Sequence, residues 1–152
     1  RIEHVETTAP SYFFLTPPAE LQRLLTGRRV ETLDRVGKYL VAGFAGGDRL
    51  LLHLGMTGQL FSSDATSVRL LSATARASLA PEEQLRFEPD EHTHLRLELE
   101  GSGPSVFFRD VRKFGKVQWL AAGESCERLE RLGTDALELT GDALFRAGRR
   151  RR

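Results

Sequence analysis

The stretch THLRLELEGSGPSVFFRD, residues 93–110, decides the fold class. Leucines at 95, 97 and 99 alternate with charged residues at 96, 98 and 100, and this period of two is typical of an antiparallel strand with one buried and one solvated face. The sequence GSG then predicts a turn, and the apolar run after it predicts a returning strand. The stretch therefore predicts an antiparallel hairpin in a mainly β protein.

Similar patterns continue on both sides of this hairpin. Further strands are predicted over residues 2–6, 29–34, 38–44, 49–54 and 114–120, with a break at Gly37 and a turn at 46–47. Short helices are predicted at 16–27, where Thr16 is the N-cap, at 125–132, and at 141–147, ending at Gly148. We therefore expect a two-layer antiparallel β-sandwich, or flattened barrel, with short peripheral helices.

Residues 62–91 differ from the rest of the chain because they are rich in Ser, Ala, Glu and Pro. This composition predicts an insertion or a long loop, with a short helix near residues 81–85.

The length of 152 residues predicts one domain, and the composition gives a net charge of +1. Four of the 22 basic residues form the run 149–152, so the remainder has 18 basic residues against 21 acidic ones, a charge of −3. A polyanion would therefore bind through a local basic patch.

The lone Cys126 excludes an internal disulfide and a Cys-rich zinc cluster, and it fits a reducing, cytoplasmic setting. The sequence contains no apolar stretch of membrane-spanning length.

Two glycine-containing motifs carry apolar residues that can reach a ligand. In HLGMTG (53–58), the only methionine of the chain stands between two glycines. A methionine often fills a gap in a core, but glycines provide no packing surface, which favours an exposed tip. In RDVRKFGK (109–116), four basic residues surround Phe114. This pattern suits nucleic acid, because cations bind phosphates and a ring can enter the base stack; the alternative is a charged hairpin whose Phe114 folds inward.

Two further motifs carry polar candidates. Lys38 follows a glycine at the start of a strand in RVGKYL (35–40), where it is either a solvated charge or a functional cation. In HTH (92–94), His92 and His94 share one strand face, as a metal site requires, but the sequence offers no third ligand nearby. Hydrogen bonding to phosphate or backbone is the favoured interpretation.

The motifs resemble a known family when they are taken together and in order. The matching segments are GRRVETLDRVGKYLVAGF (27–44), LLLHLGMTGQL (50–60), HTHLRLELE (92–100), FFRDVRKFGKVQWL (107–120) and RLGTDALE (131–138). They resemble the N-terminal domain of the formamidopyrimidine-DNA glycosylase and endonuclease VIII family, DNA repair enzymes that remove oxidised bases. The resemblance implies that residues 1–139 form a β-sandwich that is one wall of a DNA-binding cleft. It implies that residues 140–152 begin a basic linker helix towards a helix-two-turn-helix and zinc-finger domain. Zinc is therefore expected in that second domain, and no cofactor is expected in this chain.

The resemblance also implies roles for single residues. Lys38 matches the lysine that contacts the phosphates at the lesion and donates a proton during elimination. Met56, Arg112 and Phe114 match the side chains that enter the duplex where the damaged nucleotide leaves. The implied DNA contacts are Lys38, Met56, His92, Arg112, Phe114 and Arg152.

The chain departs from the family pattern at several positions. Val111 stands where the family usually has proline, which loosens the turn, and Lys113 stands for an arginine, which keeps the charge but loses a bidentate grip on phosphate. The family's nucleophile is an N-terminal proline amine followed by glutamate, and Arg1 and Ile2 are not those residues. We therefore expect a fragment that lacks about one helix ahead of Arg1 and is inactive alone.

Three hypotheses follow from these observations. The first is a DNA glycosylase with AP lyase activity that excises oxidised bases of the formamidopyrimidine and 8-oxoguanine type from double-stranded DNA. This hypothesis includes a monomer without membrane attachment in a bacterial-type cytoplasm. The second is a DNA-binding module of the same family without catalysis. The third is an unrelated β-sandwich interaction domain, which requires Met56 and Phe114 to be buried. The first two require the loops 55–58 and 111–115 to be neighbours, with Lys38 on the same side and Met56 at least partly exposed.

Overall fold

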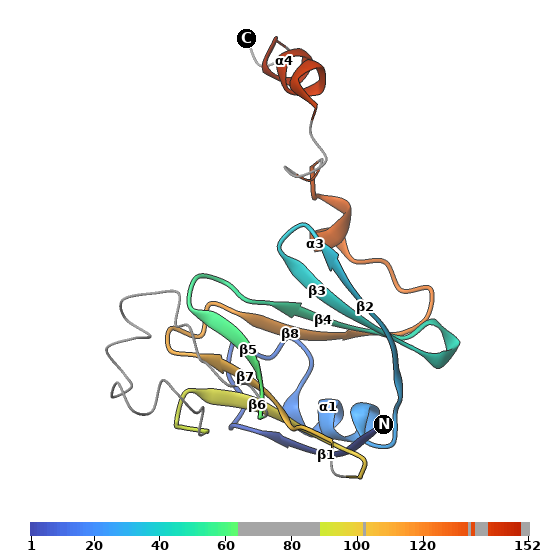
Figure 1. Cartoon of the computed structure of the whole chain (residues 1–152), viewed down its shortest axis with the longest axis vertical. Coiled ribbons are helices and arrows are strands. Elements are labelled where there is room, and N and C mark those ends of the chain that lie inside the picture. Colours follow the sequence, from blue (N-terminus) through green and yellow to red (C-terminus); the bar gives the residue numbers. More distant parts are fainter. Residues whose placement is uncertain (64–88, 102, 134, 136–139, 150–152) are drawn as a thin grey trace.

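The protein is a sandwich of two four-stranded antiparallel sheets, as a computed structural model that describes residues 1–63, 89–101, 103–133, 135 and 140–149 shows (Figure 1). The first sheet has the order β1-β6-β7-β5, and the second has the order β2-β3-β4-β8. The strands of the first sheet are β1 (Ile2–Thr7), β6 (Thr93–Leu99), β7 (Val106–Asp110) and β5 (Gly58–Ser62). Those of the second are β2 (Val30–Val36), β3 (Tyr39–Phe44), β4 (Arg49–His53) and β8 (Lys116–Leu120). The sheets are not joined into a closed barrel, so the predicted sandwich is confirmed.

The predicted hairpin over residues 93–110 is confirmed as β6 and β7. Leu95 pairs with Phe108 and Leu97 pairs with Val106 across the two strands. The leucines at alternate positions of β6 face the core, where Leu95 and Phe108 are buried against residues of the second sheet such as Leu52. Each such side chain contributes roughly 1.5–3 kcal/mol when it is fully buried. The alternating pattern therefore determines which face of this sheet becomes the core.

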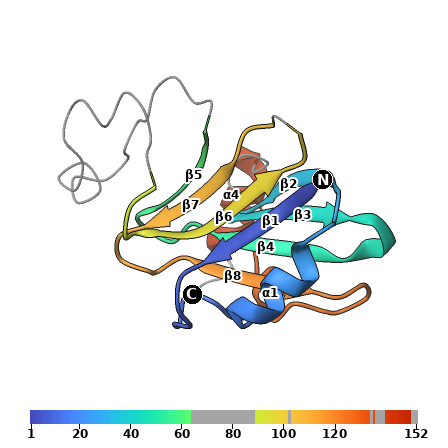
Figure 2. The same ribbon diagram turned by 90° about the horizontal axis from the view of Figure 1, so that it is seen from below.

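Helix α1 (Pro18–Leu25) lies along β1 and closes one side of the core (Figure 2). Its buried face carries Leu21 and Leu25. The predicted N-cap was wrong, because Pro17 occupies that position and the hydroxyl of Thr16 accepts a hydrogen bond from the Trp119 backbone N–H at 2.9 Å. The helix therefore begins one residue later than predicted, at Pro18.

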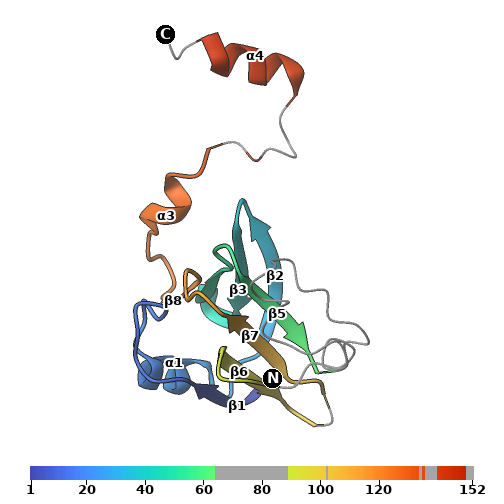
Figure 3. The same ribbon diagram turned by 90° about the vertical axis from the view of Figure 1, so that its left-hand side faces the viewer.

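Two further helices follow β8 along the chain (Figure 3). Helix α3 (Glu127–Glu130) is shorter than predicted, and the neighbouring Leu129 and Leu132 pack on the outer face of the second sheet against Tyr39 and Leu51. Helix α4 (Gly141–Arg149) continues through Gly148 instead of ending there. Within the described residues, none of the helices is long and apolar enough to cross a membrane.

The remaining differences concern turns and strand ends. A short 3-10 helix, η1 (Ala45–Gly47), makes the predicted turn between β3 and β4. Strand β5 was not predicted, and the strand predicted from residue 114 begins only at Lys116. The helix predicted near residues 81–85 lies outside the described residues. As a result, residues 111–115 form a turn between β7 and β8, and this turn contributes to the candidate site.

Candidate nucleic-acid interface

Strand pairing brings the predicted motifs to one edge of the sandwich. In the second sheet, His53 at the end of β4 pairs with Tyr39 at the start of β3 and with Lys116 at the start of β8. In the first sheet, Gly58 at the start of β5 pairs with Asp110 at the end of β7. Lys38 precedes Tyr39, and the loops 54–57 and 111–115 follow His53 and Asp110. All of these segments therefore leave the sheets at the same edge.

Met56, Arg112 and Phe114 form a surface cluster at this edge. The Arg112 guanidinium donates to Met56 Sδ at 3.8 Å, and its central carbon lies 4.3 Å from the centroid of the Phe114 ring. Met56 is 69% exposed and Phe114 is 42% exposed. The prediction that the two loops are neighbours with an exposed Met56 is confirmed. The hypothesis of an unrelated domain with both side chains buried is wrong.

The buried carboxylate of Asp110 holds the two loops together. Oδ1 accepts hydrogen bonds from the Thr57 hydroxyl and from the Arg112 backbone N–H at 3.3 Å, and Oδ2 accepts one from the Gly115 backbone N–H at 2.6 Å. The Asp110 backbone N–H donates to the carbonyl oxygen of His92 at 2.9 Å. Asp110 thus connects three loops, a role that the sequence motif did not reveal.

Glycine is required where the loops touch. A Cβ atom on Gly55, whose φ is +64°, would lie 2.8 Å from the backbone nitrogen of Gly115 and from the carbonyl carbon of Phe114. A Cβ on Gly58 would lie 2.1 Å from the carbonyl oxygen of Leu54. These contacts are shorter than packed atoms allow, so Gly55 lets the Met56 loop lie directly on the Phe114 turn, and Gly58 lets the same loop close on Leu54.

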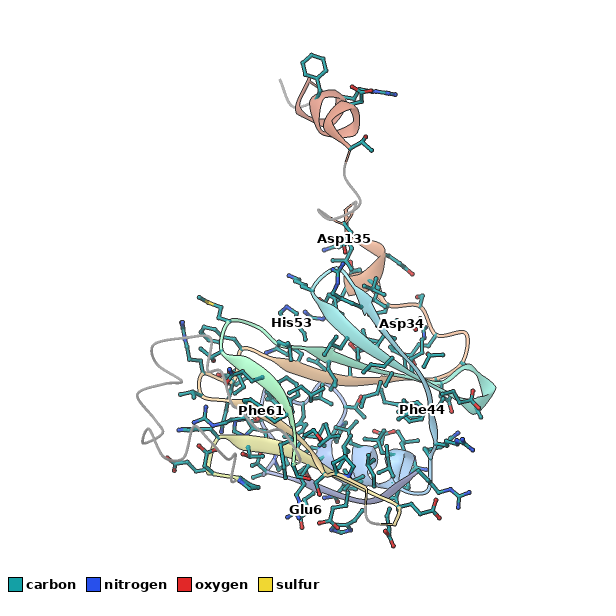
Figure 4. The ribbon with its side chains drawn as sticks, in the orientation of Figure 1. Glu6, Asp34, Phe44, His53, Phe61 and Asp135 are labelled. Carbon is teal, nitrogen blue, oxygen red and sulfur yellow. The ribbon has the colours of Figure 1, made fainter. Side chains whose placement is uncertain are left out.

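Lys38, Lys116 and Arg128 surround His53 and form a basic group next to the cluster. Lys38 is exposed and follows Gly37, whose φ is +58°. His53 lies between the β2–β3 hairpin and the β4–β5 loop, with its ring 4.9 Å from that of Tyr39 (Figure 4). Burial lowers the pKa of His53, and the positive charges of Lys38, Lys116 and Arg128 lower it further. His53 is therefore mainly neutral at pH 7, in a positive field that favours an anion.

The two histidines of the HTH motif have different environments. The side chain of His92 is 26% exposed, and its Nε2 lies 3.7 Å from a carboxylate oxygen of Glu91. His94 is buried, with Nε2 2.9 Å from the carbonyl oxygen of Asp110 and Nδ1 3.2 Å from the Thr8 hydroxyl. Burial lowers the pKa of His94, which outweighs the opposing effect of the hydrogen bond to Asp110. His94 is therefore hydrogen-bonded on both nitrogens and is not free to bind a metal.

No group of three or more His, Cys, Asp or Glu side chains that could hold a metal occurs in the part of the chain that the structure describes. Arg152, the last of the predicted DNA contacts, lies outside the described residues. The described site thus consists of cations and exposed apolar groups.

Comparison with known proteins identifies the family. Residues 1–117 match the model of the formamidopyrimidine-DNA glycosylase N-terminal domain. The chain belongs to the formamidopyrimidine-DNA glycosylase family. It is 37% identical to the formamidopyrimidine-DNA glycosylase of Moorella thermoacetica, over 99% of this chain and 50% of that protein. It is 35% identical to that of Methylobacterium nodulans, over 98% of this chain and 49% of that protein. The chain thus spans about half the length of the curated glycosylases it matches.

Solved glycosylase structures resemble this fold. A complex of the Lactococcus lactis glycosylase with DNA containing FAPY-dG aligns with a TM-score of 0.57 and 26% identity, over 79% of this chain and 37% of that one. A complex of the same glycosylase with DNA containing an abasic site aligns with a TM-score of 0.57 over 79% of this chain and 36% of that one. The family resemblance that the sequence motifs indicated is therefore confirmed.

Proposed function

We propose that this chain is the N-terminal β-sandwich of a DNA glycosylase with AP lyase activity that excises oxidised bases of the formamidopyrimidine and 8-oxoguanine type from double-stranded DNA. The observation that carries the proposal is the exposed cluster of Met56, Arg112 and Phe114 beside the basic group around Lys38. The names of the related glycosylases and the damaged DNA bound to the Lactococcus lactis enzyme support it.

The cluster has the chemistry that base removal demands. A base must leave the stack before its sugar carbon can be attacked, and its departure leaves a hole and an unpaired partner base. Met56 is a flexible apolar side chain that fills the hole, and the Arg112 guanidinium hydrogen-bonds the unpaired base. The Phe114 ring enters the neighbouring base step and kinks the duplex there.

The basic group supplies the phosphate contacts and a proton. In the proposed reaction, an amine nitrogen bonds to the sugar C1′ as the base leaves with the electron pair of the glycosidic bond and gains a proton. The attacking nitrogen loses a proton, and the C1′–O4′ bond then breaks with protonation of O4′, which opens the sugar ring to an iminium. Loss of a C2′ proton from this iminium breaks the C3′–O bond, and the phosphate leaves as the 5′ end of the downstream strand. Lys38 holds the lesion phosphate and donates a proton in this elimination, and His92 adds a DNA contact. No residue of this chain is assigned the role of the attacking amine, which in the family is an N-terminal proline.

The remaining expectations from the sequence complete the proposal. The sandwich covers residues 1–139, and a basic linker from residue 140, with Arg152 in contact with DNA, leads to a domain that binds zinc. The sandwich itself needs no cofactor. The proposed protein acts as a monomer on damaged duplex DNA in a bacterial cytoplasm.

The experiment uses the protein as its gene encodes it and a duplex with one 8-oxoguanine. We expect strand incision and a covalent complex trapped by borohydride. Lys38→Ala should lower incision, and Lys38→Arg, which keeps the positive charge but is a poor proton donor, should restore DNA affinity more than incision. Residues 1–152 alone should bind DNA without forming a trapped complex.

Three results would contradict parts of this proposal. Binding to damaged DNA without excision by the encoded protein would support the non-catalytic module instead. A trapped complex formed by residues 1–152 and retained in Lys38→Ala would show that another amine acts. Equal affinity for intact and damaged duplexes would contradict the proposal that Met56, Arg112 and Phe114 enter the duplex at the lesion.

A further inference from the structure

Tyr12 belongs to a third segment that reaches the cluster of Met56, Arg112 and Phe114. It lies in the connection between β1 and α1, and its hydroxyl donates to the carbonyl oxygen of Arg112 at 3.0 Å. The Lys116 ammonium lies 4.9 Å from the centroid of the Tyr12 ring. Tyr12 nevertheless remains 60% exposed, and these two contacts are with the 111–115 turn and with the first residue of β8.

The segment that carries Tyr12 is held firmly in place. Phe13 is buried, with its ring 4.9 Å from that of Phe108. Phe14 forms a parallel bridge with Val117 of β8, where the Val117 N–H donates to the carbonyl oxygen of Phe13 at 3.0 Å. The Leu15 N–H donates to the carbonyl oxygen of Val117 at 2.9 Å. The backbone next to Tyr12 is therefore fixed to β8, the strand that follows the turn.

The polar backbone groups of the 111–115 turn are divided between two sets of partners. Asp110 accepts from the N–H groups of residues 112 and 115. Tyr12 donates to the carbonyl oxygen of residue 112, and Lys116 Nζ donates to those of residues 114 and 115 at 3.3 and 2.9 Å. Lys113 in the middle of this turn has a φ of +55°, a conformation that persists only when its surroundings enforce it. The Tyr12 hydroxyl thus holds the carbonyl side of Arg112, the residue that carries the guanidinium, while Asp110 and the Thr57 hydroxyl hold its N–H.

We infer that Tyr12 is a positioning residue for Arg112. By fixing the Arg112 carbonyl, it directs the Arg112 side chain towards the unpaired base and keeps the turn from rearranging when DNA binds. The inference rests on the proposed function, since Arg112 must enter the duplex for its position to matter. An exposed hydrogen bond contributes little to folding, so its loss should affect DNA binding more than stability.

The test compares variants of the protein as its gene encodes it. Tyr12→Phe removes the hydroxyl and keeps the ring beside Lys116, and Tyr12→Leu removes both. Thr26→Val is the matched control, because the Thr26 hydroxyl also makes an exposed bond to a backbone carbonyl, that of Gln22 at 2.7 Å, at the end of α1. The readouts are affinity for a duplex with a stable abasic-site analogue, fluorescence of a 2-aminopurine opposite the analogue, and the melting temperature.

We expect Tyr12→Phe to bind the analogue about threefold to tenfold more weakly, the loss that one hydrogen bond produces. Its 2-aminopurine signal at saturation should be smaller than that of the wild type, with an unchanged melting temperature. Tyr12→Leu should show at least the same effects, and Thr26→Val should behave as the wild type.

Each contrary result has a distinct meaning. If the wild type does not prefer the abasic-site duplex, the proposed function fails, and the inference fails with it. If the wild type prefers that duplex and Tyr12→Phe matches it in affinity and fluorescence, the positioning role is overturned and the proposed function stands. A loss of affinity in Tyr12→Leu alone would show that the ring contacts DNA directly. A fall in the melting temperature of Tyr12→Phe would show a structural role. Either of these last two results would overturn the inference that Tyr12 positions Arg112.

Discussion

The buried carboxylate of Asp110 makes the Asp110→Asn substitution informative. An asparagine keeps one acceptor oxygen and replaces the other by an NH₂ group, which cannot accept a hydrogen bond. The Thr57 hydroxyl can turn to accept from this NH₂ group, but the N–H groups of Arg112 and Gly115 can only donate. At least one bond to a charged acceptor is lost, and the N–H of either Gly115 or Arg112 then faces the NH₂ group; Arg112 keeps a second bond, to the Thr57 hydroxyl at 3.3 Å. We therefore expect a loss of about 2–3 kcal/mol in the free energy of unfolding.

Urea unfolding measures this loss directly. Trp119 is the only tryptophan and is buried against Phe44, so its fluorescence reports on the core. The midpoint should fall without a change in the m value. Asp34→Asn, at an exposed position of β2, removes the same charge and serves as the control. A loss below about 0.5 kcal/mol in Asp110→Asn, the size of a surface substitution, would refute the idea that this carboxylate holds the loops.

Three further substitutions test other parts of the site. Met56→Ala should change the free energy of unfolding by less than about 0.5 kcal/mol, since Met56 is exposed, yet weaken binding to the abasic-site analogue; a loss of several kcal/mol would mean that Met56 is structural. The folded-state pKa of His94 is lowered from 6.5, so its contribution to stability is present above that pH and is lost as pH falls through the folded pKa. His94→Gln should therefore show a smaller loss of stability on acidification than the wild type, unlike the exposed control His4→Gln, and equal losses would contradict the assignment. Lys113→Gly should raise stability by up to about 1 kcal/mol by relieving the positive φ and reduce the slope of log affinity against log salt by about 0.9; a lower melting temperature would show that the turn is not strained.

The parts of the fold that the sequence predicted correctly depend on local patterns. The hairpin of residues 93–110 could be predicted because the alternation of its leucines directly reflects which face is buried. The N-cap at Thr16 could not, because the hydroxyl bonds to Trp119, which is 103 residues away. Strand β5 was missed because its first residue, Gly58, has a low preference for strands and is needed for close packing on Leu54.

The candidate site shows the same division. Met56 and Phe114 were identified from motifs because an apolar side chain is unusual at a glycine-containing turn, and Arg112 was identified through the family resemblance. Asp110 and Tyr12 were not, because an aspartate at a strand end and a tyrosine in a loop are ordinary until their partners are known. Asp110 bonds to Thr57, which is 53 residues earlier in the chain, and Tyr12 bonds to Arg112, which is 100 residues later.

Val111 shows how these long-range bonds matter for the site. A proline at this position would restrict φ by its ring, and valine does not provide that restriction. In this protein the turn is instead bonded by Asp110 from β7, by Lys116 from β8, and by Tyr12 from the β1–α1 connection. The first two are part of the strands that the turn joins, so they move with it, whereas Tyr12 is anchored through Phe13 in the core. The position of Arg112 relative to the rest of the sandwich therefore depends on a residue outside the RDVRKFGK turn motif, and this dependence is what the Tyr12 variants measure.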